Sequence, residues 1–189
     1  DIYGFLLEKP SLPLAHFAPD YTCYICSLSK SICSGLRIAY LTFPTRFAAD
    51  IRRGIYNVNV KTPSLNSETA GELIYSGTAK KIIGQKRMEA AARSEICKDF
   101  FPEIAKNPLG FSLWLPLPER FHETNFEHLA QKRGISVCHS HRFLVGEADA
   151  QQYLRIALSS PDTKEELTKG LSILRDLFTS EIAEKSFCI

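Results

Sequence analysis

The stretch that decides the fold is Ser27–Leu41, which reads SLSKSICSGLRIAYL. It follows directly on a predicted apolar strand, Tyr21–Cys26, and it leads through a polar turn into a second predicted strand, Leu36–Phe43. The second run is almost continuously apolar, as strands that are covered on both faces tend to be. Open α/β sheets bind their ligands just past the ends of strands. Lys30 and Arg37 therefore occupy positions where a ligand is expected.

Outward from this stretch, strands and helices alternate along the chain. A further apolar strand is predicted at Asp1–Leu7, and a helix is predicted from Pro44 to about residue 58, because proline suits the first helical turn. Residues 67–101 have a helical pattern, with Gly77 and Gly84 as possible breaks. The remaining elements are strands at 110–117, 135–138 and 153–159 and helices at 123–133 and 163–178.

Local signals refine the second half of the chain. Gly134 is expected to end its helix in the left-handed conformation, and Asp162-x-x-Glu165 has the spacing of a capping box at the start of the last helix. Trp114 is expected in the core, and the basic run Lys80–Arg87 is interpreted as the solvated face of a long helix. The fold class is α/β, divided into an incomplete first lobe at 1–66, a long helical region at 67–101 and a small α/β domain at 102–189.

Composition narrows the range of functions. The 189 residues include 23 Lys+Arg and 21 Asp+Glu, so the chain lacks the basic excess of a DNA-binding module that acts alone. Its apolar runs fall short of the roughly 18 residues that a membrane-spanning helix needs, so no membrane partner is expected. The chain starts at Asp1 without the features of a signal peptide, which predicts a piece of a longer protein. The six cysteines are not needed as disulfide staples in a chain of this size, which favours a cytoplasmic location.

A zinc site is one alternative that the residues suggest. Cys23-x-x-Cys26 and the stretch 138–141, which reads CHSH, contain the donor types that zinc prefers. An offset of three on a strand, however, directs the two thiols to opposite faces. No metal is therefore expected, and His139 and His141 receive no role.

A second alternative is a serine enzyme. Ser27-x-x-Lys30 matches the Ser-x-x-Lys motif of penicillin-binding enzymes. Those enzymes also need Ser-Asp-Asn and Lys-Thr-Gly partners, which the sequence lacks. This interpretation is therefore set aside.

Several polar residues converge on one kind of ligand. On a strand, Asp1 and Tyr3 share a face, so that a carboxylate and a phenol can meet the same molecule. Lys30 and Arg37 lie together beyond a strand end. Arg155 is a lone charge in an apolar strand, and a charge in that position needs a partner or a ligand.

Ser27–Leu41 resembles the lysine segment of fold type I pyridoxal-phosphate enzymes, the aspartate-aminotransferase superfamily. Asp1-x-Tyr3 resembles the Asp-x-Tyr pair of that family, and YLRIALS at 153–159 resembles its carboxylate-binding arginine strand. The sequence is most similar to the aminotransferase-like domain of MocR regulators, a branch of the GntR transcription factors, which also carry a tryptophan strand like GFSLWLPLP at 110–118. The resemblance covers essentially the whole chain. It implies the C-terminal part of the cofactor-binding large domain, a long linking helix and the small C-terminal α/β domain.

The resemblance also implies a role for each residue. Lys30 is expected to form the covalent link to pyridoxal phosphate and then to act as the base that moves a proton. Asp1 is expected to keep the pyridine nitrogen protonated, and Tyr3 to hydrogen-bond the ring oxygen. The remaining implied contacts are with the cofactor phosphate, by Ser27 and Arg37, and with the α-carboxylate of an amino-acid ligand, by Arg155.

Two functions share these residues. The leading one is the effector-sensing domain of a MocR/GntR-type regulator, and the alternative is a free-standing aminotransferase that moves an amino group between an α-amino acid and a 2-oxo acid. The family's phosphate loop and ring-stacking residue precede its Asp-x-Tyr pair, and this chain starts at that pair. The chain alone is therefore expected to be inactive, to lack the cofactor, and to associate with a second copy or a complementing fragment. DNA contact is expected only through a missing N-terminal module.

Overall fold

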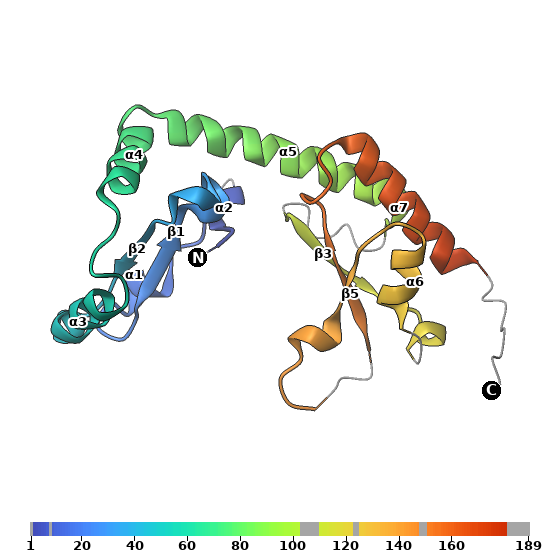
Figure 1. Ribbon diagram of the computed structural model, residues 1–189, viewed down its shortest axis with the longest axis horizontal. Helices are drawn as coiled ribbons and strands as arrows, with labels where there is room; N and C mark the ends of the chain where they lie inside the picture. The colour runs from blue at the N-terminus through green and yellow to red at the C-terminus, as the bar shows by residue number, and fades with distance from the viewer. Residues whose placement is uncertain (1, 8, 103–109, 123–124, 148–150, 181–189) are drawn as a thin grey trace. The chain divides into compact units, whose positions relative to one another are not determined.

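The computed structural model describes residues 2–7, 9–102, 110–122, 125–147 and 151–180 (Figure 1). The chain divides into two compact units, Asp1–Glu89 and Ala90–Ile189. Helix α5, Thr78–Phe100, supplies residues to both units. None of the helices in the described ranges combines the length and the apolar content that crossing a membrane requires.

The first unit contains a two-stranded antiparallel sheet. Strand β1, Tyr24–Ser27, pairs with β2, Ala39–Thr42, so that Ser27 lies opposite Ala39. Both predicted strands are present, but the interpretation of the second as covered on both faces is wrong. Three of the four β2 residues are exposed. The buried cluster of this unit is built instead from helices and the loop between the strands, through Leu28, Ile32, Ile38, Ala70 and Ala79.

The strand predicted at Asp1–Leu7 is also wrong over its described part. Gly4–Leu6 forms the 3₁₀-helix η1, in which Leu6 N–H donates to the Tyr3 carbonyl at 3.0 Å and Leu7 N–H to the Gly4 carbonyl at 3.1 Å. A strand requires a neighbour with free backbone groups, whereas the Leu6 and Leu7 N–H groups are already satisfied within this segment. The prediction for Asp1 lies outside the described residues.

Helices form the rest of the first unit. The helix expected from Pro44 is confirmed as the 3₁₀-helix η3, Thr45–Phe47, followed by α3, Ala48–Asn59. Gly77 adopts a φ of 75° and separates α4, Ser64–Tyr75, from α5, so this predicted break is confirmed. Gly84 lies inside α5 and does not break it, because an interior glycine costs only about 1 kcal/mol. The short helices are α1, Leu14–Phe17, α2, Leu28–Ser31, and the 3₁₀-helix η2, Ser34–Leu36.

The second unit is a three-stranded antiparallel sheet with helices packed against it (Figure 1). Its strand order is β3-β5-β4, with Ser112–Pro116, Tyr153–Ala157 and Cys138–His139 respectively. Of the strand predicted at 135–138, only its last residue is in β4. The helices are η4, Glu119–Phe121, α6, Phe126–Lys132, η5, Ser140–Phe143, and α7, Lys164–Thr179.

Alternation along β3 decides which residues form the core of this unit. Leu113 and Leu115 are buried, whereas Trp114 between them is 44% exposed. The expectation that Trp114 is a core residue is therefore wrong, because successive side chains of a strand point to opposite faces. Trp114 instead contacts the Phe143 and Tyr153 rings edge-on. The main buried cluster contains Leu115, Leu117, Phe121, Phe126, Ala130, Leu154, Leu174 and Leu177.

The two cap predictions differ in outcome. Gly134 follows α6 with a φ of 82°, as expected for a left-handed cap. At α7 the cap is Thr163 rather than Asp162: the Thr163 hydroxyl accepts a hydrogen bond from Glu166 N–H at 3.1 Å. The Glu166 carboxylate accepts one from Asp162 N–H at 3.0 Å. The spacing of a capping box is present one residue later than predicted, but the Glu166 carboxylate accepts from the residue before the cap and not from the cap itself.

Candidate functional site

Three of the predicted site residues lie at the end of β1 and in the loop that joins it to β2. Ser27 is the last residue of β1, and Leu28 N–H donates to the Ile38 carbonyl at 3.0 Å, which closes the two ends of the loop together. Lys30 and Arg37 lie within this closed loop, and both are exposed. The structure therefore brings a hydroxyl, an amine and a guanidinium onto one short connection.

Helix α2 carries Lys30 between two buried residues. Ser27 caps the helix: its hydroxyl accepts from Ser29 N–H at 3.2 Å and donates to the Ser29 hydroxyl at 3.1 Å. Leu28 and Ile32 bury their side chains in the core of the first unit on either side of Lys30. The cap role of Ser27 was missed in the sequence, although serine at the residue before a helical turn is a recognised N-cap signal.

Arg37 has a left-handed backbone, with φ 51° and ψ 35°. This conformation costs an L-residue roughly 1–2 kcal/mol and is uncommon outside glycine and asparagine. Within the described residues no carboxylate lies within ion-pair distance of its guanidinium. Arg37 is therefore a strained, exposed cation that is available to an anion.

The segment that carries Tyr3 lies beside the same loop. Ile2, Gly4 and Phe5 line a cavity of about 610 Å³ together with Ser27 and other residues of the first unit. The other lining residues are Cys26, Leu28, Ser31, Ile32, Ile74, Ala79, Lys80, Ile83, Gly84 and Arg87. Tyr3 itself is half-buried and precedes η1. Its segment therefore borders the same cavity as Ser27 and α2, but Tyr3, Lys30 and Arg37 are not among the residues that line this cavity.

Arg155 belongs to the second unit. It lies in β5 opposite Trp114 of β3 and Cys138 of β4. The side chain is half-buried, and its guanidinium carbon is 6.0 Å from the centre of the Phe143 ring. Among the described residues it has no carboxylate partner. A half-buried guanidinium without an acid can bind the carboxylate of a ligand.

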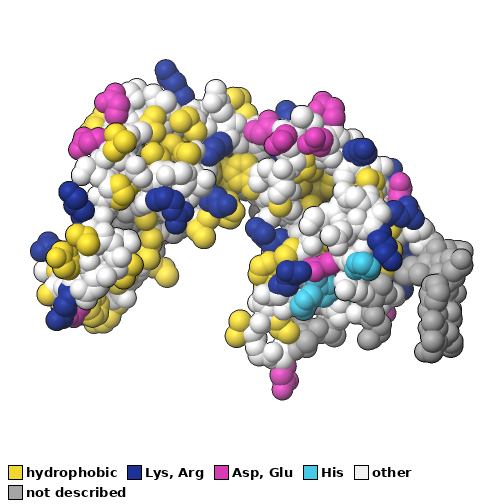
Figure 2. Space-filling model, in the orientation of Figure 1, with side chains coloured by type: hydrophobic (Ala, Val, Ile, Leu, Met, Phe, Trp, Pro, Cys, Tyr) yellow, Lys and Arg dark blue, Asp and Glu magenta, His cyan; other side chains and the backbone are white. Residues whose placement is uncertain are grey.

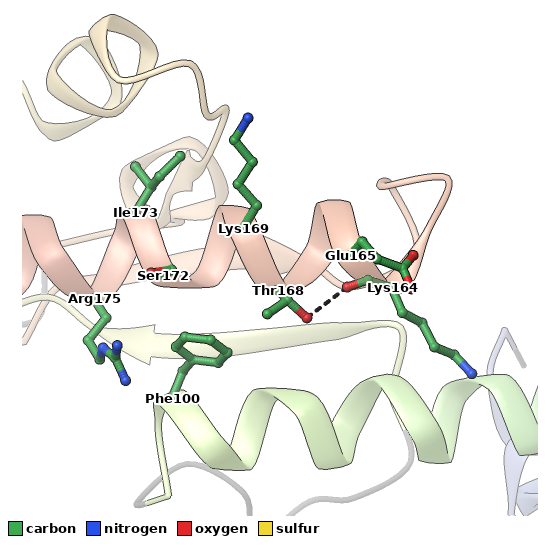
Figure 3. Close-up of a pocket in the computed structure, with 8 residues that line it drawn as sticks. All are labelled: Phe100, Lys164, Glu165, Thr168, Lys169, Ser172, Ile173 and Arg175. Atoms are coloured by element: carbon green, nitrogen blue, oxygen red, sulfur yellow. Dashed lines mark hydrogen bonds between the residues drawn. The ribbon is translucent and has the colours of Figure 1, made fainter.

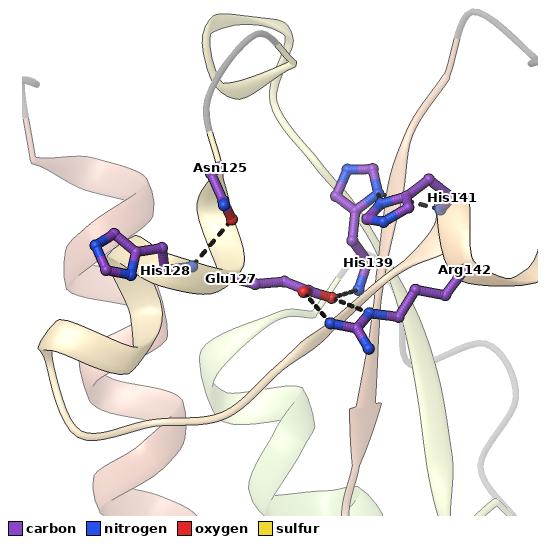
Figure 4. Close-up of polar contacts among 6 residues, drawn as sticks. All are labelled: Asn125, Glu127, His128, His139, His141 and Arg142. Atoms are coloured by element: carbon purple, nitrogen blue, oxygen red, sulfur yellow. Dashed lines mark hydrogen bonds and ion pairs between the residues drawn. The ribbon is translucent and has the colours of Figure 1, made fainter.

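A second polar cluster occupies the loop around η5 (Figure 4). Glu127 of α6 accepts from Arg142 at 2.9 Å and 2.5 Å, in a two-pronged pair, and from the backbone N–H of His139 at 2.7 Å. The His139 and His141 Nδ1 atoms are 2.7 Å apart, and His139 Nε2 lies 2.9 Å from Gln152 Oε1. The described residues contain no group of three His, Cys, Asp or Glu side chains that could hold a metal. The cluster therefore ties a loop to α6.

This cluster makes the loop sensitive to acid. The hydrogen bonds from Arg142, aided by the His139 N–H, lower the pKa of Glu127 although partial burial opposes the shift. A lowered carboxyl pKa gives a contribution to stability that is complete above the usual value of about 4.3 and is lost as the pH falls through the folded-state value. We expect the protection of the His139 amide against hydrogen exchange to decrease as the pH is lowered from the usual carboxyl value through the folded-state pKa of Glu127. A Glu127→Gln variant should show no such pH dependence, and equal profiles for the two proteins would contradict this assignment.

The second unit has a cavity of its own, which is lined by none of the predicted site residues. It measures about 570 Å³ and is formed by Phe100 and one side of α7 (Figure 3). The Arg175 guanidinium lies over the Phe100 ring at 4.8 Å, and the Thr168 hydroxyl donates to the Lys164 carbonyl at 2.8 Å. The first contact joins α7 to Phe100 of α5, and the second lies within α7. The candidate site is therefore still the loop that carries Lys30.

Known proteins are similar to the chain over most of its length. No family model matches the chain. It is 34% identical to an uncharacterized HTH-type transcriptional regulator of Bacillus subtilis, YdeF, over 91% of this chain and 38% of the relative. It is 26% identical to an uncharacterized aminotransferase of Saccharolobus solfataricus over 97% of this chain and 48% of that protein. The chain thus spans half or less of the length of these curated relatives.

Solved structures show the same fold at lower identity. The kynurenine aminotransferase of Pyrococcus horikoshii superimposes with a TM-score of 0.80 at 17% identity, over 96% of this chain and 48% of that protein. The α-aminoadipate aminotransferase of Thermus thermophilus gives a TM-score of 0.78 at 19% identity, over 93% of this chain and 48% of that protein. Over about half the length of these proteins, the chain has the fold of the fold type I pyridoxal-phosphate-dependent aminotransferase superfamily.

Proposed function

We propose that the full-length protein binds pyridoxal phosphate through this chain and is a cytoplasmic regulator of the MocR/GntR type, in which the aminotransferase-like domain senses an effector. The observation that carries the proposal is the loop between β1 and β2, which presents Lys30 and Arg37 as exposed cations without an acid partner among the described residues. The similarity to an HTH-type regulator supports the regulatory form of the proposal.

The residues present fit the chemistry of this cofactor. An aldehyde is bound covalently by an amine, which Lys30 supplies, and a phosphate is bound by hydroxyl and guanidinium groups, which Ser27 and Arg37 supply. A phenol such as Tyr3 can donate to the ring oxygen. When bound, pyridoxal phosphate acts as an electron sink that stabilises negative charge at the α-carbon of an amino acid.

Each residue would then have a definite role. Lys30 would hold the cofactor through its amine, and the same amine could move a proton to or from the α-carbon of an amino-acid ligand. Arg37 would bind the phosphate with its planar guanidinium fork. Asp1 would keep the pyridine nitrogen protonated. Arg155 binds the α-carboxylate of the ligand and thereby selects amino acids or 2-oxo acids.

A free-standing aminotransferase is the second candidate. It is favoured by the similarity to the archaeal aminotransferase, which extends over 97% of this chain. The same residues serve both functions, so the two differ in what the full-length protein does after binding the cofactor. A regulator changes its affinity for DNA, whereas an enzyme releases a 2-oxo acid repeatedly.

The deciding experiment uses the full-length protein with pyridoxal phosphate and a mixture of amino acids. We expect the affinity of the protein for DNA from the region upstream of its own gene to change on addition of the cofactor. We also expect no more than one equivalent of 2-oxo acid to form per site. Repeated turnover without an effect on DNA binding would support the enzyme instead. Absence of cofactor binding would overturn both.

The first unit also offers a surface for a partner. Figure 2 shows apolar side chains over this unit, and the exposed ones on its strands and on α3 and α4 include Ile25, Tyr40, Ile55, Tyr56, Leu65 and Tyr75. Apolar area left in water forfeits about 25 cal/mol per Å². We infer that a second copy of the chain, or the remaining part of the full-length protein, covers this surface and completes the cofactor site.

A further inference from the structure

Two neighbouring cations of α5 hold the two segments that carry the candidate site. The first is Lys86. Its ammonium donates to the Lys30 carbonyl at 2.9 Å and to the Ile32 carbonyl at 2.8 Å. These two carbonyls lie at the end of α2, where the backbone of a helix has no further N–H groups to accept from. Lys86 therefore supplies the donor that the end of this helix lacks.

The second cation is Arg87, which holds the other segment. Its Nε donates to the Phe5 carbonyl at 2.6 Å, and its terminal nitrogen donates to the Leu7 carbonyl at 3.0 Å. Both carbonyls belong to the turn around η1 that follows Tyr3. The planar guanidinium is suited to two donations of fixed geometry. Arg87 thus fixes the segment of Tyr3 as Lys86 fixes that of Lys30.

Neither segment has enough structure to hold its own position. Helix α2 contains four residues and η1 contains three, and helices of one turn are unstable in isolation. Helix α5, in contrast, has 23 residues. Because consecutive positions on a helix point in different directions, Lys86 and Arg87 can reach two separate segments from one rigid element.

The environment of Lys86 agrees with this arrangement. Its pKa is lowered, chiefly because the ammonium is partly buried; the nearby Cys33 opposes this shift, and the positive charge of Lys30 adds to it. The Lys86 side chain is half-buried against the lysine loop. The interpretation of the whole run Lys80–Arg87 as a solvated face is therefore wrong for Lys86.

We propose that Lys86 and Arg87 are positioning residues. They hold the lysine loop and the Tyr3 segment at fixed positions on α5, so that both segments reach one pyridoxal phosphate. The proposal rests on the proposed function for its ligand, and it concerns two residues to which that function assigns no contact with the phosphate or the reacting amine. Each cation acts through the backbone of the segment it holds. Loss of either should therefore loosen one segment selectively and weaken the cofactor site.

The test compares Lys86→Met and Arg87→Met in the full-length protein with Lys81→Met, which removes an exposed lysine from the same helix. In the protein without cofactor, Lys86→Met should speed hydrogen exchange at the Ile32 and Cys33 amides at least tenfold, because these amides close the turn onto the Leu28 carbonyl. Arg87→Met should act instead at the amides of residues 6 and 7. Lys81→Met should change neither.

Cofactor affinity is the second readout, followed by the visible absorbance of pyridoxal phosphate during titration. Lys86→Met and Arg87→Met should each bind the cofactor at least tenfold more weakly than Lys81→Met. Lys86→Arg should keep most of the affinity of the unsubstituted protein, because arginine is also a charged donor. Unchanged exchange at Ile32 and Cys33, or equal affinity of Lys86→Met and Lys81→Met, would overturn the positioning role. Failure of the unsubstituted protein to bind the cofactor would instead overturn the proposed function, so the two failures are distinguishable.

Discussion

Arg37→Ala in the full-length protein should weaken the binding of pyridoxal phosphate by about 2–4 kcal/mol, which is roughly a 30- to 700-fold rise in the dissociation constant. The reason is the loss of a charge-assisted, two-pronged contact with the phosphate. Arg37 already holds a left-handed backbone and has no acid partner among the described residues, so its side chain forms no ion pair there that the substitution would break. Titration of the visible absorbance measures the effect.

The matched control is Arg52→Ala, which removes an exposed arginine from α3 in the same unit. It should leave the affinity unchanged while altering the net charge equally. If both variants bind alike, the effect of Arg37 is a general charge effect and its place in the phosphate site is wrong. The stability of Arg37→Ala should stay within about 1 kcal/mol of the parent, since the removed side chain is exposed.

The second large effect concerns stability. Arg93 is only 6% exposed, and its guanidinium donates to the carbonyls of Leu158 at 2.7 Å, Pro161 at 2.8 Å and Asp162 at 3.3 Å. It thereby joins α5 to the chain that leads from β5 into α7. Arg93→Met leaves these carbonyls without their charged donor, and we expect a loss of about 3 kcal/mol in the free energy of unfolding.

Chemical denaturation with two further variants tests the role of Arg93. Arg93→Lys keeps the charge but cannot reach three carbonyls with a planar fork, so it should recover only part of the stability. Arg133→Met removes an exposed arginine after α6 and should cost less than about 0.5 kcal/mol. If Arg93→Met lowers the free energy of unfolding by less than about 1 kcal/mol, the stabilising role of the three Arg93 hydrogen bonds is wrong.

The sequence predicted local structure well where the signal was itself local. The breaks at Gly77 and Gly134 follow from the need for a positive φ, and the helix after Pro44 follows from the fixed φ of proline. Predictions failed where a distant element decides. Residues 1–7 have the composition of a strand, but Arg87 donates hydrogen bonds to the Phe5 and Leu7 carbonyls, and no described strand pairs with this segment.

The candidate site shows the same division. Lys30 and Arg37 could be proposed from the sequence because both lie in the segment that resembles the family's lysine segment, just past a predicted strand. The role of Lys86 could not, because a lysine among other charged residues on a helix has the pattern of a solvated face. Only the fold places this lysine against the carbonyls of residues 30 and 32, which are more than 50 positions away in the chain.

The most direct test of the account is to locate the lysine that binds the cofactor. The full-length protein is incubated with pyridoxal phosphate, the link is reduced with borohydride, and the labelled peptide is identified by mass spectrometry. We expect one label per chain, on Lys30, and none in Lys30→Ala, whereas Lys81→Met should be labelled as the unsubstituted protein is. Labelling spread over several surface lysines, or a label that persists in Lys30→Ala, would contradict the central claim.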